Sequence, residues 1–552
     1  MLGMKFKIVV SASLMAGSLI GLIEALTILV GAGAGEYDAL FWGVLAYSLL
    51  CIVCMPVSFL IACLLPIEQE RLWLSIFLGL VGVLWSWLFT SSFWELVAQI
   101  ILLAFCFWFG TIILRRTPLK ILLHLKGGMG IFSFILLVVG IFSLTPGRNI
   151  YAPPTHALSA AGKPNVLILL VDGLRRDYLR LGMSPAIDSF VQRSVQFDQA
   201  FANAPDAFGS VAQLLSGGAS NDKTFLSEEV VSLAEHLAYH GYRTFALVNQ
   251  PELGRFSNLH QGFDHYRYLP PRSSLPLNEG TRRLKIFQTI FSYQAQVLID
   301  PNRLYRPARD VFFQFQQETR QDPSDETPWF GLLQISELTP PFFVQRLDGE
   351  YTEVLSPQQA NPHEVQRVYV DSLRKVDQDI SRLLLYLEQS GLKENTIVVL
   401  TASHSTPLTK RSPNHPVGLQ IPLFISSPKI QPKQIRQTVQ LADLPMTLSS
   451  LVSVSPDSSW QGEMIFRLPP NDHVRPIRAS FQDRERGWEL LQQGDWRYIQ
   501  HQHLEDELYN LSRDPFQEKN LIRENPKQKE KMRQLLEQNR NKNFLPNRGN
   551  PR

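Results

Sequence analysis

Cysteine is scarce in this chain of 552 residues, and its few copies are confined to one end. The four cysteines are Cys51, Cys54, Cys63 and Cys106. Everything after Cys106 therefore has no disulfide, no thiol nucleophile and no thiolate ligand for a metal. Cys51 and Cys54 form a CxxC pair, but they lie inside an apolar run, which favours small packed side chains over a redox pair.

An excess of charge of one sign is also lacking. The chain carries 53 Lys and Arg against 50 Asp and Glu, a formal net charge of +3, so its overall electrostatics do not point to nucleic acid. The apolar residues, by contrast, are unevenly spread. The first 150 or so residues are membrane-like, and the rest has the composition of a soluble protein. The length allows for more than one domain.

Five apolar runs in the N-terminal region have the length of membrane-spanning helices. They comprise residues 8–30, 40–65, 72–90, 96–114 and 128–144. Lys5 and Lys7 precede the first run, and Arg115 and Lys120 lie between the fourth and the fifth. Positive charge marks the cytoplasmic side of a membrane protein. We therefore expect a membrane domain over residues 1–147, with a cytoplasmic amino terminus and everything after the fifth helix outside the cytoplasm.

The remainder of the chain reads as a linker, a domain and a tail. Residues 148–163 are rich in Pro, Ala and Gly and are typical of a linker. In residues 164–524, apolar strands alternate with amphipathic helices, which predicts an α/β domain with a mostly parallel sheet sandwiched by helices. The polar residues 525–552 predict a flexible tail. Among the expected elements are strands at 242–248, 329–335, 396–400 and 421–425 and a helix at 365–388.

One stretch of the expected domain carries the clearest chemical signal. It reads KPNVLILLVDGLRRD, an apolar run that ends at Asp172 and Gly173. A continuous apolar run is typical of a buried parallel strand, and ligands of open α/β sheets bind beyond the carboxyl ends of the strands. Asp172 is therefore a candidate metal ligand, or it caps the next helix. Gly173 permits a tight turn or a close approach of backbone to a ligand.

Several blocks together resemble the sulfatase and lipid-headgroup phosphotransferase branch of the alkaline phosphatase superfamily. They read PNVLILLVDGLRRDYL, SPAIDSF, FDQAFANAPDAFGSVAQLLSGG, LAEHLAYHGYRTFALV, SGLKENTIVVLTASH, LADLPMTLSSLV and ELYNLSRDPFQEKNL. The resemblance extends over nearly the whole soluble part. It implies a sulfatase-like fold, a divalent-metal site and a nucleophile at the start of a helix.

The chain departs from this family at the implied catalytic positions. Sulfatases use a modified cysteine and phosphotransferases a threonine where this chain has Ala207, whose methyl group cannot act as a nucleophile. Asp206 and Ser210 are the fallback nucleophiles if the register is different. The second acidic metal ligand corresponds to Ser403, and a hydroxyl is a poorer ligand than a carboxylate. His404, beside it, is retained.

Few candidate site residues therefore remain. Asp172 and His404 are the candidate metal ligands. The resemblance implies a substrate-binding role for His415, and Arg175 is close enough to Asp172 in sequence to meet an anionic ligand, or else lies on a solvated helix face. We expect no cofactor, with zinc, magnesium or manganese bound only if the site still functions. Thr339 replaces a histidine that relatives carry before a proline.

Two functions remain open. In the first, the domain is non-catalytic and regulatory, as in the PbgA (YejM) family of lipopolysaccharide regulators, whose architecture of five spans and an altered sulfatase-like domain is similar. That similarity implies a bacterial inner-membrane protein with a periplasmic carboxy-terminal domain. It also implies lipopolysaccharide, phospholipid or an inner-membrane protein as partner, besides the bilayer itself. In the second, the domain is an active metal-dependent hydrolase or lipid-headgroup phosphotransferase with an atypical nucleophile. No nucleic-acid partner is expected.

Overall fold

The computed structural model describes most of the chain after the predicted linker and none of the predicted membrane domain. The five expected spans lie outside the described residues. Among the residues that are described, no helix is both long enough and apolar enough to cross a bilayer. The described ranges are 158–179, 182–218, 226–254, 257–270, 306–320, 326–340, 342–345, 351–355, 361–408, 416–467, 475–482, 487–514 and 517–542.

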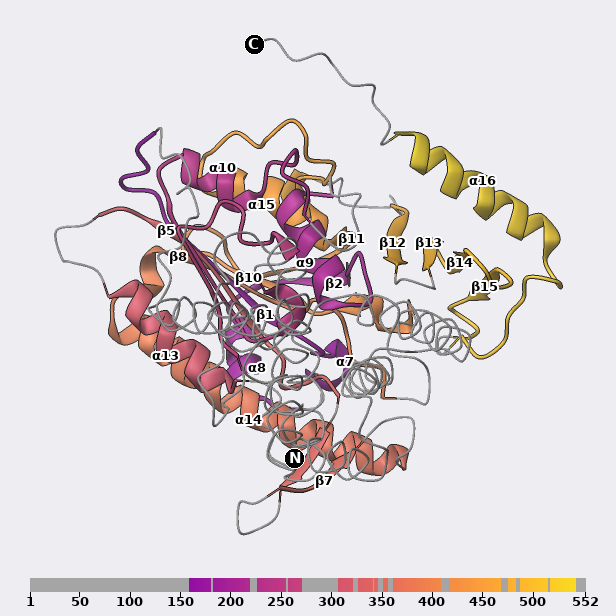
Figure 1. The fold of residues 1–552 in the computed structure, drawn as a ribbon, viewed down its shortest axis with the longest axis horizontal. Helices are drawn as coiled ribbons and strands as arrows, with labels where there is room; N and C mark the ends of the chain where they lie inside the picture. The colour runs from indigo at the N-terminus through magenta and orange to yellow at the C-terminus, as the bar shows by residue number, and fades with distance from the viewer. Residues whose placement is uncertain are drawn as a thin grey trace, which may run out of the picture. The chain divides into compact units, whose positions relative to one another are not determined.

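Within these ranges, nine strands form one mixed sheet that is mostly parallel (Figure 1). Its order is β11-β2-β10-β8-β1-β5-β3-β4, and β9 pairs with β2. β10 runs antiparallel to β2 and β8, and β9 runs antiparallel to β2, whereas the other pairs are parallel. The strands are β1 (Asn165–Val171), β2 (Val195–Phe201), β3 (Arg243–Val248), β4 (His265–Tyr268), β5 (Trp329–Ile335), β8 (Thr396–Thr401), β9 (Gln420–Ile421), β10 (Leu423–Ser426) and β11 (Lys433–Gln440).

Helices cover both faces of this sheet (Figure 1). α9, α10 and α15 lie on one face, and α13 and α14 lie on the other. α8 packs with α14, where Asp377 accepts hydrogen bonds from the backbone N–H groups of Ala186 and Ile187. The helices are α7 (Arg176–Leu179), α8 (Pro185–Gln192), α9 (Ala207–Ser216), α10 (Leu233–Tyr239), α13 (Ala308–Thr319), α14 (Pro362–Gln389) and α15 (Leu444–Leu451). The layers confirm the predicted sandwiched α/β domain.

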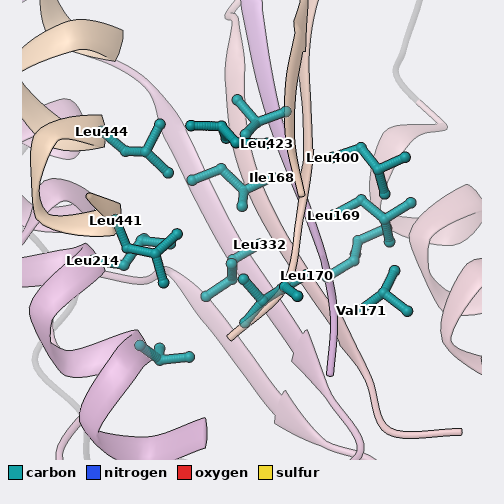
Figure 2. Packing of buried hydrophobic residues seen from close by; sticks show 14 of the residues in the cluster. Ile168, Leu169, Leu170, Val171, Leu214, Leu332, Leu400, Leu423, Leu441 and Leu444 are labelled. Atoms are coloured by element: carbon teal, nitrogen blue, oxygen red, sulfur yellow. The ribbon is translucent and has the colours of Figure 1, made fainter. Parts of the chain in front are cut away.

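The core lies on both sides of β1, whose seven residues are all buried. Successive side chains of a strand point to opposite faces. Figure 2 accordingly shows Ile168 and Leu170 on the side of Leu214, and Leu169 and Val171 on the other side. Burying each such side chain contributes about 1.5–3 kcal/mol, which explains why the six residues of β1 after Asn165 are all apolar.

Most predicted elements are present with small shifts at their ends. The predicted strand 329–335 is β5, and the predicted helix 365–388 is α14, which starts earlier because Asn361 caps it through its side chain. The predicted strand 421–425 is instead divided into β9 and β10 at Pro422, because proline has no N–H to donate to a neighbouring strand.

A smaller antiparallel sheet follows the main one in the sequence. Its order is β12-β13-β14-β15, from β12 (Ile477–Gln482), β13 (Gly487–Gln493), β14 (Trp496–His501) and β15 (Glu507–Asn510). A two-stranded sheet is formed by β6 (Phe342–Gln345) and β7 (Tyr351–Leu355).

The C-terminal segment differs from the flexible tail predicted for residues 525–552. Residues Pro526–Lys542 form the helix α16, and Met532 and Leu536 are buried in a cluster with Leu491 and Tyr498 of the smaller sheet. Met532 and Leu536 are four residues apart, so they share one face of a helix. The polar composition concealed this narrow apolar stripe. Residues 543–552 lie outside the described part.

Truncation of Leu536 tests whether α16 is docked. Leu536→Ala should lower the free energy of unfolding by about 2–5 kcal/mol, because it leaves a cavity beneath the helix. The matched control is Leu504→Ala, since Leu504 lies between β14 and β15 and is 68% exposed; its effect should stay within about 0.5 kcal/mol. Thermal unfolding of the purified protein measures both. Equal melting temperatures for the two variants would contradict a docked α16.

Candidate functional site

The candidate site begins where three neighbouring strands end. β1 lies between β5 and β8, and both pairs are parallel. Their carboxyl ends therefore meet at one edge of the sheet, where ligands of α/β proteins bind. Asp172 directly follows β1, Gln334 lies near the end of β5, and Ser403 and His404 come shortly after β8. The structure thus brings together the two candidate metal ligands predicted from the sequence, Asp172 and His404.

Asp172 is fully buried, and both of its carboxylate oxygens are occupied by neutral donors. The Ser403 hydroxyl donates to Oδ1, and the Gln334 amide Nε2 donates to Oδ2 at 2.6 Å. These partners come from β5 and from the residues after β8. The alternative role of Asp172 as a cap for α7 therefore finds no support in its hydrogen bonds.

Gln334 is the centre of this polar network, and the sequence analysis missed it. Its Oε1 accepts from the backbone N–H groups of Asn249 at 3.0 Å and Gln250 at 3.2 Å. Its Nε2 also donates to Ser336 Oγ at 2.9 Å, and that hydroxyl donates to Asn249 Oδ1 at 2.7 Å. One signal was available: Gln334 is a polar residue inside the otherwise apolar strand WFGLLQI.

Gly173 closes the turn behind Asp172 and joins the strand ends. Its N–H donates to the His404 carbonyl at 2.9 Å, and its φ is +79°. A Cβ at this position would lie 2.2 Å from the Leu338 carbonyl oxygen and 2.4 Å from Thr406 Oγ1. Residue 173 must therefore be glycine, as expected, because a side chain would clash with the neighbouring protein groups.

The electrostatics of the site follow from burial. Burial raises the pKa of Asp172 to about 7, against the opposing effect of the Ser403 and Gln334 hydrogen bonds. Burial also raises the pKa of Glu337 to about 7. The Oε1 atom of Glu337 accepts a hydrogen bond from the Ala308 N–H, and its buried Oε2 atom has no hydrogen-bond partner among the described residues.

His404 is half-buried, and desolvation lowers its pKa to about 4. The His404 imidazole is therefore neutral at physiological pH.

The position implied for the nucleophile lies at the start of α9. Ala207 is the first residue of this helix and is 1% exposed. The fallback nucleophiles have structural partners: Asp206 caps the helix by accepting from Gly209 N–H at 2.7 Å, and Ser210 Oγ donates to the Ala204 carbonyl at 2.9 Å. These contacts give Asp206 and Ser210 structural roles at the start of the helix.

Glu252 interacts electrostatically with Asp172 and also with Asp206, the residue that caps α9. Glu252, in the short helix η1 (Pro251–Leu253), raises the pKa of Asp172 by charge repulsion. The pKa of Glu252 is itself raised, mainly by burial and further by Asp206. Glu252 is thus within electrostatic reach of both Asp172 and Asp206.

Arg175, a predicted substrate-binding residue, is held by protein groups. Its Nε and Nη2 donate to the Asp177 carboxylate at 3.0 and 2.7 Å, and its Nη1 donates to the Thr406 carbonyl at 3.0 Å. Its backbone N–H donates to Tyr369 Oη at 2.9 Å, and the Tyr369 hydroxyl donates to the Gly173 carbonyl at 3.0 Å. Arg175 and Tyr369 therefore brace the turn after β1. His415, the other predicted substrate-binding residue, lies outside the described residues.

The described donors do not fit a divalent-cation site. Such cations require several oxygen or nitrogen ligands, usually including more than one carboxylate or imidazole. No group of three His, Cys, Asp or Glu side chains among the described residues could hold a metal. Of the carboxyl groups described at the strand ends, Asp172 already accepts hydrogen bonds at both oxygens, and Glu337 accepts one from the Ala308 N–H. No catalytic step through a metal can be derived from this arrangement.

The comparison with known proteins agrees with this fold. The sulfatase family matches residues 164–454, more than half of the chain. The chain belongs to the sulfatase family.

The following similar proteins have low sequence identity to this chain. An arylsulfatase of Clostridium perfringens (strain 13 / Type A) is 22% identical over 441 residues, which cover 65% of this chain and 90% of the relative. The phosphonate monoester hydrolases of Silicibacter pomeroyi and Agrobacterium radiobacter superpose with TM-scores of 0.54 and 0.52. Each is 16% identical, and each alignment covers 69% of this chain and 96% of the hydrolase. At these identities the structural likeness shows the fold alone.

The raised carboxyl pKa values predict an acid-stabilised domain. Asp172 and Glu337 bind a proton more tightly when folded than when unfolded, where such groups titrate near pH 4. Between about pH 4 and 7 the folded state holds more protons, so the free energy of unfolding falls as pH rises, by up to about 1.4 kcal/mol per pH unit for each group. Glu337→Gln should remove one such contribution. Urea unfolding at pH 5, 6 and 7 measures the slope.

Glu228→Gln is the control for this pH series, since Glu228 is an exposed carboxyl in a loop. It should leave the slope unchanged. A Glu337→Gln variant with the same slope as the parent protein would show that Glu337 is ionised in the folded state over this pH range.

Proposed function

We propose that this protein is a membrane-embedded member of the sulfatase family with a degenerate site. It binds an envelope lipid or a protein partner in a regulatory or envelope-maintenance role. The observation that carries the proposal is the hydrogen bond from Ser403 to Asp172. In the resemblance drawn from the sequence, an acidic residue takes the place of Ser403, and the two acids share a cation. Here a neutral hydroxyl meets the carboxylate directly.

The start of α9 supports the same proposal. A family nucleophile needs a hydroxyl or a modified thiol, and Ala207 offers only a methyl group. The neighbouring polar groups, Asp206 and Ser210, are used in capping and in anchoring the helix. Loss of both nucleophile and charged ligand removes the groups that would build and stabilise a transition state.

Sequence features of the N-terminal region support the membrane location. The five apolar runs of residues 1–147 and the basic residues between them are typical of a polytopic membrane protein. We propose a bacterial inner-membrane protein with the sulfatase-family domain in the periplasm, similar in architecture to the PbgA family. Lipopolysaccharide, phospholipid or an inner-membrane protein is then the proposed partner.

The alternative is an active metal-dependent hydrolase or lipid-headgroup phosphotransferase with an atypical nucleophile. The relative named as an arylsulfatase favours it. Asp206, which is half-buried and whose pKa is raised by desolvation, or Ser210 would be its nucleophile, with Asp172 and His404 as metal ligands. The two functions make opposite predictions for turnover.

Turnover assays separate the two functions. The purified full-length protein in detergent should not hydrolyse 4-nitrophenyl sulfate or 4-nitrophenyl phosphate above the rate of its Asp172→Ala variant. Added manganese, magnesium or zinc should not change this, because the donors at the strand ends cannot hold the ion. Elemental analysis of the same preparation should find no stoichiometric metal. Metal-dependent turnover that Asp172→Ala abolishes would establish the enzymatic alternative.

The location can be tested with a single introduced thiol. The native cysteines all lie in the predicted spans, so Leu504→Cys, at a 68% exposed position, would place the one thiol after the predicted spans, in the expected extracytoplasmic part of the chain. A membrane-impermeant maleimide should label Leu504→Cys in spheroplasts with intact inner membranes. Lys120→Cys, in a predicted cytoplasmic loop, is the matched control and should react only after lysis. The reverse pattern would invert the proposed topology.

A further inference from the structure

Arg243, the first residue of β3, has a guanidinium group that no other described residue engages. Its side chain makes no hydrogen bond or ion pair within the described part of the chain, although its Nε and Nη2 atoms are both buried. Charged groups that are removed from water are normally paired, because an unpaired buried charge is costly. A buried donor without an acceptor in a native protein indicates a bound water or ion at that position.

The two buried atoms are the pair with which arginine grips an anion. Nε–H and one N–H of Nη2 point in the same direction and form a fork that matches two oxygens of a carboxylate, phosphate or sulfate group. Arg175 holds the Asp177 carboxylate in this way at 3.0 and 2.7 Å, and Arg523 holds the Glu505 carboxylate at 2.9 Å through each nitrogen. The same fork of Arg243 has no acceptor among the described residues.

A third buried donor lies on the neighbouring strand. Trp329, the first residue of β5, is paired with Arg243 in the parallel register, so both side chains are on the same face of the sheet. This is the face covered by α13, since the rings of Trp329 and Phe245 both contact Phe315 of that helix. Trp329 is fully buried, and its indole Nε1 has no hydrogen-bond partner among the described residues. Donors gathered without an acceptor favour an anionic ligand.

The carboxylate in the last turn of α13 does not fill this role. Glu318 Oε2 is paired with His265 at 2.8 Å, and Glu318 Oε1 is paired with Arg267 at 3.2 Å. Both partners belong to β4, so Glu318 could turn to Arg243 only by giving up its contacts with that strand. A ligand from outside the protein, by contrast, would displace no hydrogen bond that the Arg243 side chain makes within the described part.

These donors are remote from the candidate site around Asp172. Arg243 and Trp329 are at the amino ends of β3 and β5, whereas Asp172 is at the carboxyl edge of the sheet. β5 has seven residues, so its two ends are about 20 Å apart. The backbone of Arg243 is fixed by its N–H, which donates to the Pro328 carbonyl at 3.0 Å. The fork therefore has a rigid base.

We propose that Arg243 binds a phosphate or sulfate group through Nε and Nη2 at the amino edge of the sheet. Trp329 Nε1 is the third donor, and it favours these groups over a carboxylate, which has only two oxygens. Arg243 is half-buried and its Nη1 atom is not among the buried atoms without a partner, so the guanidinium is reached from solvent. The group belongs either to a free anion or to a phospholipid headgroup. This site does not depend on the proposed function.

Thermal unfolding of the full-length protein in dodecyl maltoside, a detergent without phosphate, tests the site. Sodium phosphate or sodium sulfate should raise the melting temperature relative to sodium chloride at the same ionic strength, because a ligand that binds the folded state stabilises it. Arg243→Gln should abolish this rise. Arg243→Lys keeps the charge without the fork and should weaken the affinity for phosphate by about tenfold. Arg367→Lys, at an exposed position of α14, is the matched control and should respond like the parent protein.

Two results would overturn the site. One is a parent protein that neither phosphate nor sulfate stabilises, which would mean that water alone meets the fork. The other is an unchanged response in both Arg243 variants, which would place the anion elsewhere. If the variants do not fold, crystals of the parent protein soaked in selenate decide the question. The anomalous signal of selenium should lie at the Arg243 fork, and a signal only at other positions would contradict the proposal.

Nanodiscs distinguish the two sources of the anion. Phosphatidylcholine is the base lipid, and phosphatidic acid, whose phosphate is a terminal monoester, is added to it. If a headgroup occupies the fork, phosphatidic acid should raise the melting temperature of the parent protein but not that of Arg243→Gln, and sodium phosphate should add nothing further. If the ligand is a free anion, sodium phosphate should stabilise the parent protein as it does in detergent, whichever lipid is present. Either Arg243-dependent response supports the site, and the absence of both overturns it.

Discussion

The parallel pairing of β1 with both β5 and β8 is the constraint on which the site depends. It brings Asp172, Gln334 and Ser403 to one edge of the sheet, although they are far apart in the sequence. Because the strands are buried on both faces, this edge cannot shift without disturbing the core. The side chains at the strand ends must therefore satisfy one another, and the hydrogen bonds to Asp172 are how they do so.

Neutral donors compensate a buried carboxylate less well than a cation would. Two hydrogen bonds reach Asp172, yet its pKa stays near 7, because desolvation outweighs them. Opposite charge nearby would favour the ionised form more strongly. The site is therefore arranged around a carboxyl that is costly to ionise, and its neighbours Glu252 and Glu337 add to that cost.

Much of the fold and part of the candidate site could be predicted from local sequence patterns, and the rest of the site could not. The apolar run before Asp172 predicted β1 and its buried end, and the spacing of apolar residues predicted α14. Gln334 was missed because its role depends on backbone groups after β3, which no local pattern places beside β5. The docking of α16 was missed because a short apolar stripe, with Met532 and Leu536 on one face, is hidden by its polar surroundings.

The turn at Gly173 limits which amino-acid substitutions the site can accept. Its backbone is enclosed by the Leu338 carbonyl and the Thr406 hydroxyl, so the turn tolerates no side chain. Any residue other than glycine at this position would have to displace the Leu338 carbonyl or the Thr406 hydroxyl, so variants of this chain that keep the turn must also keep the glycine.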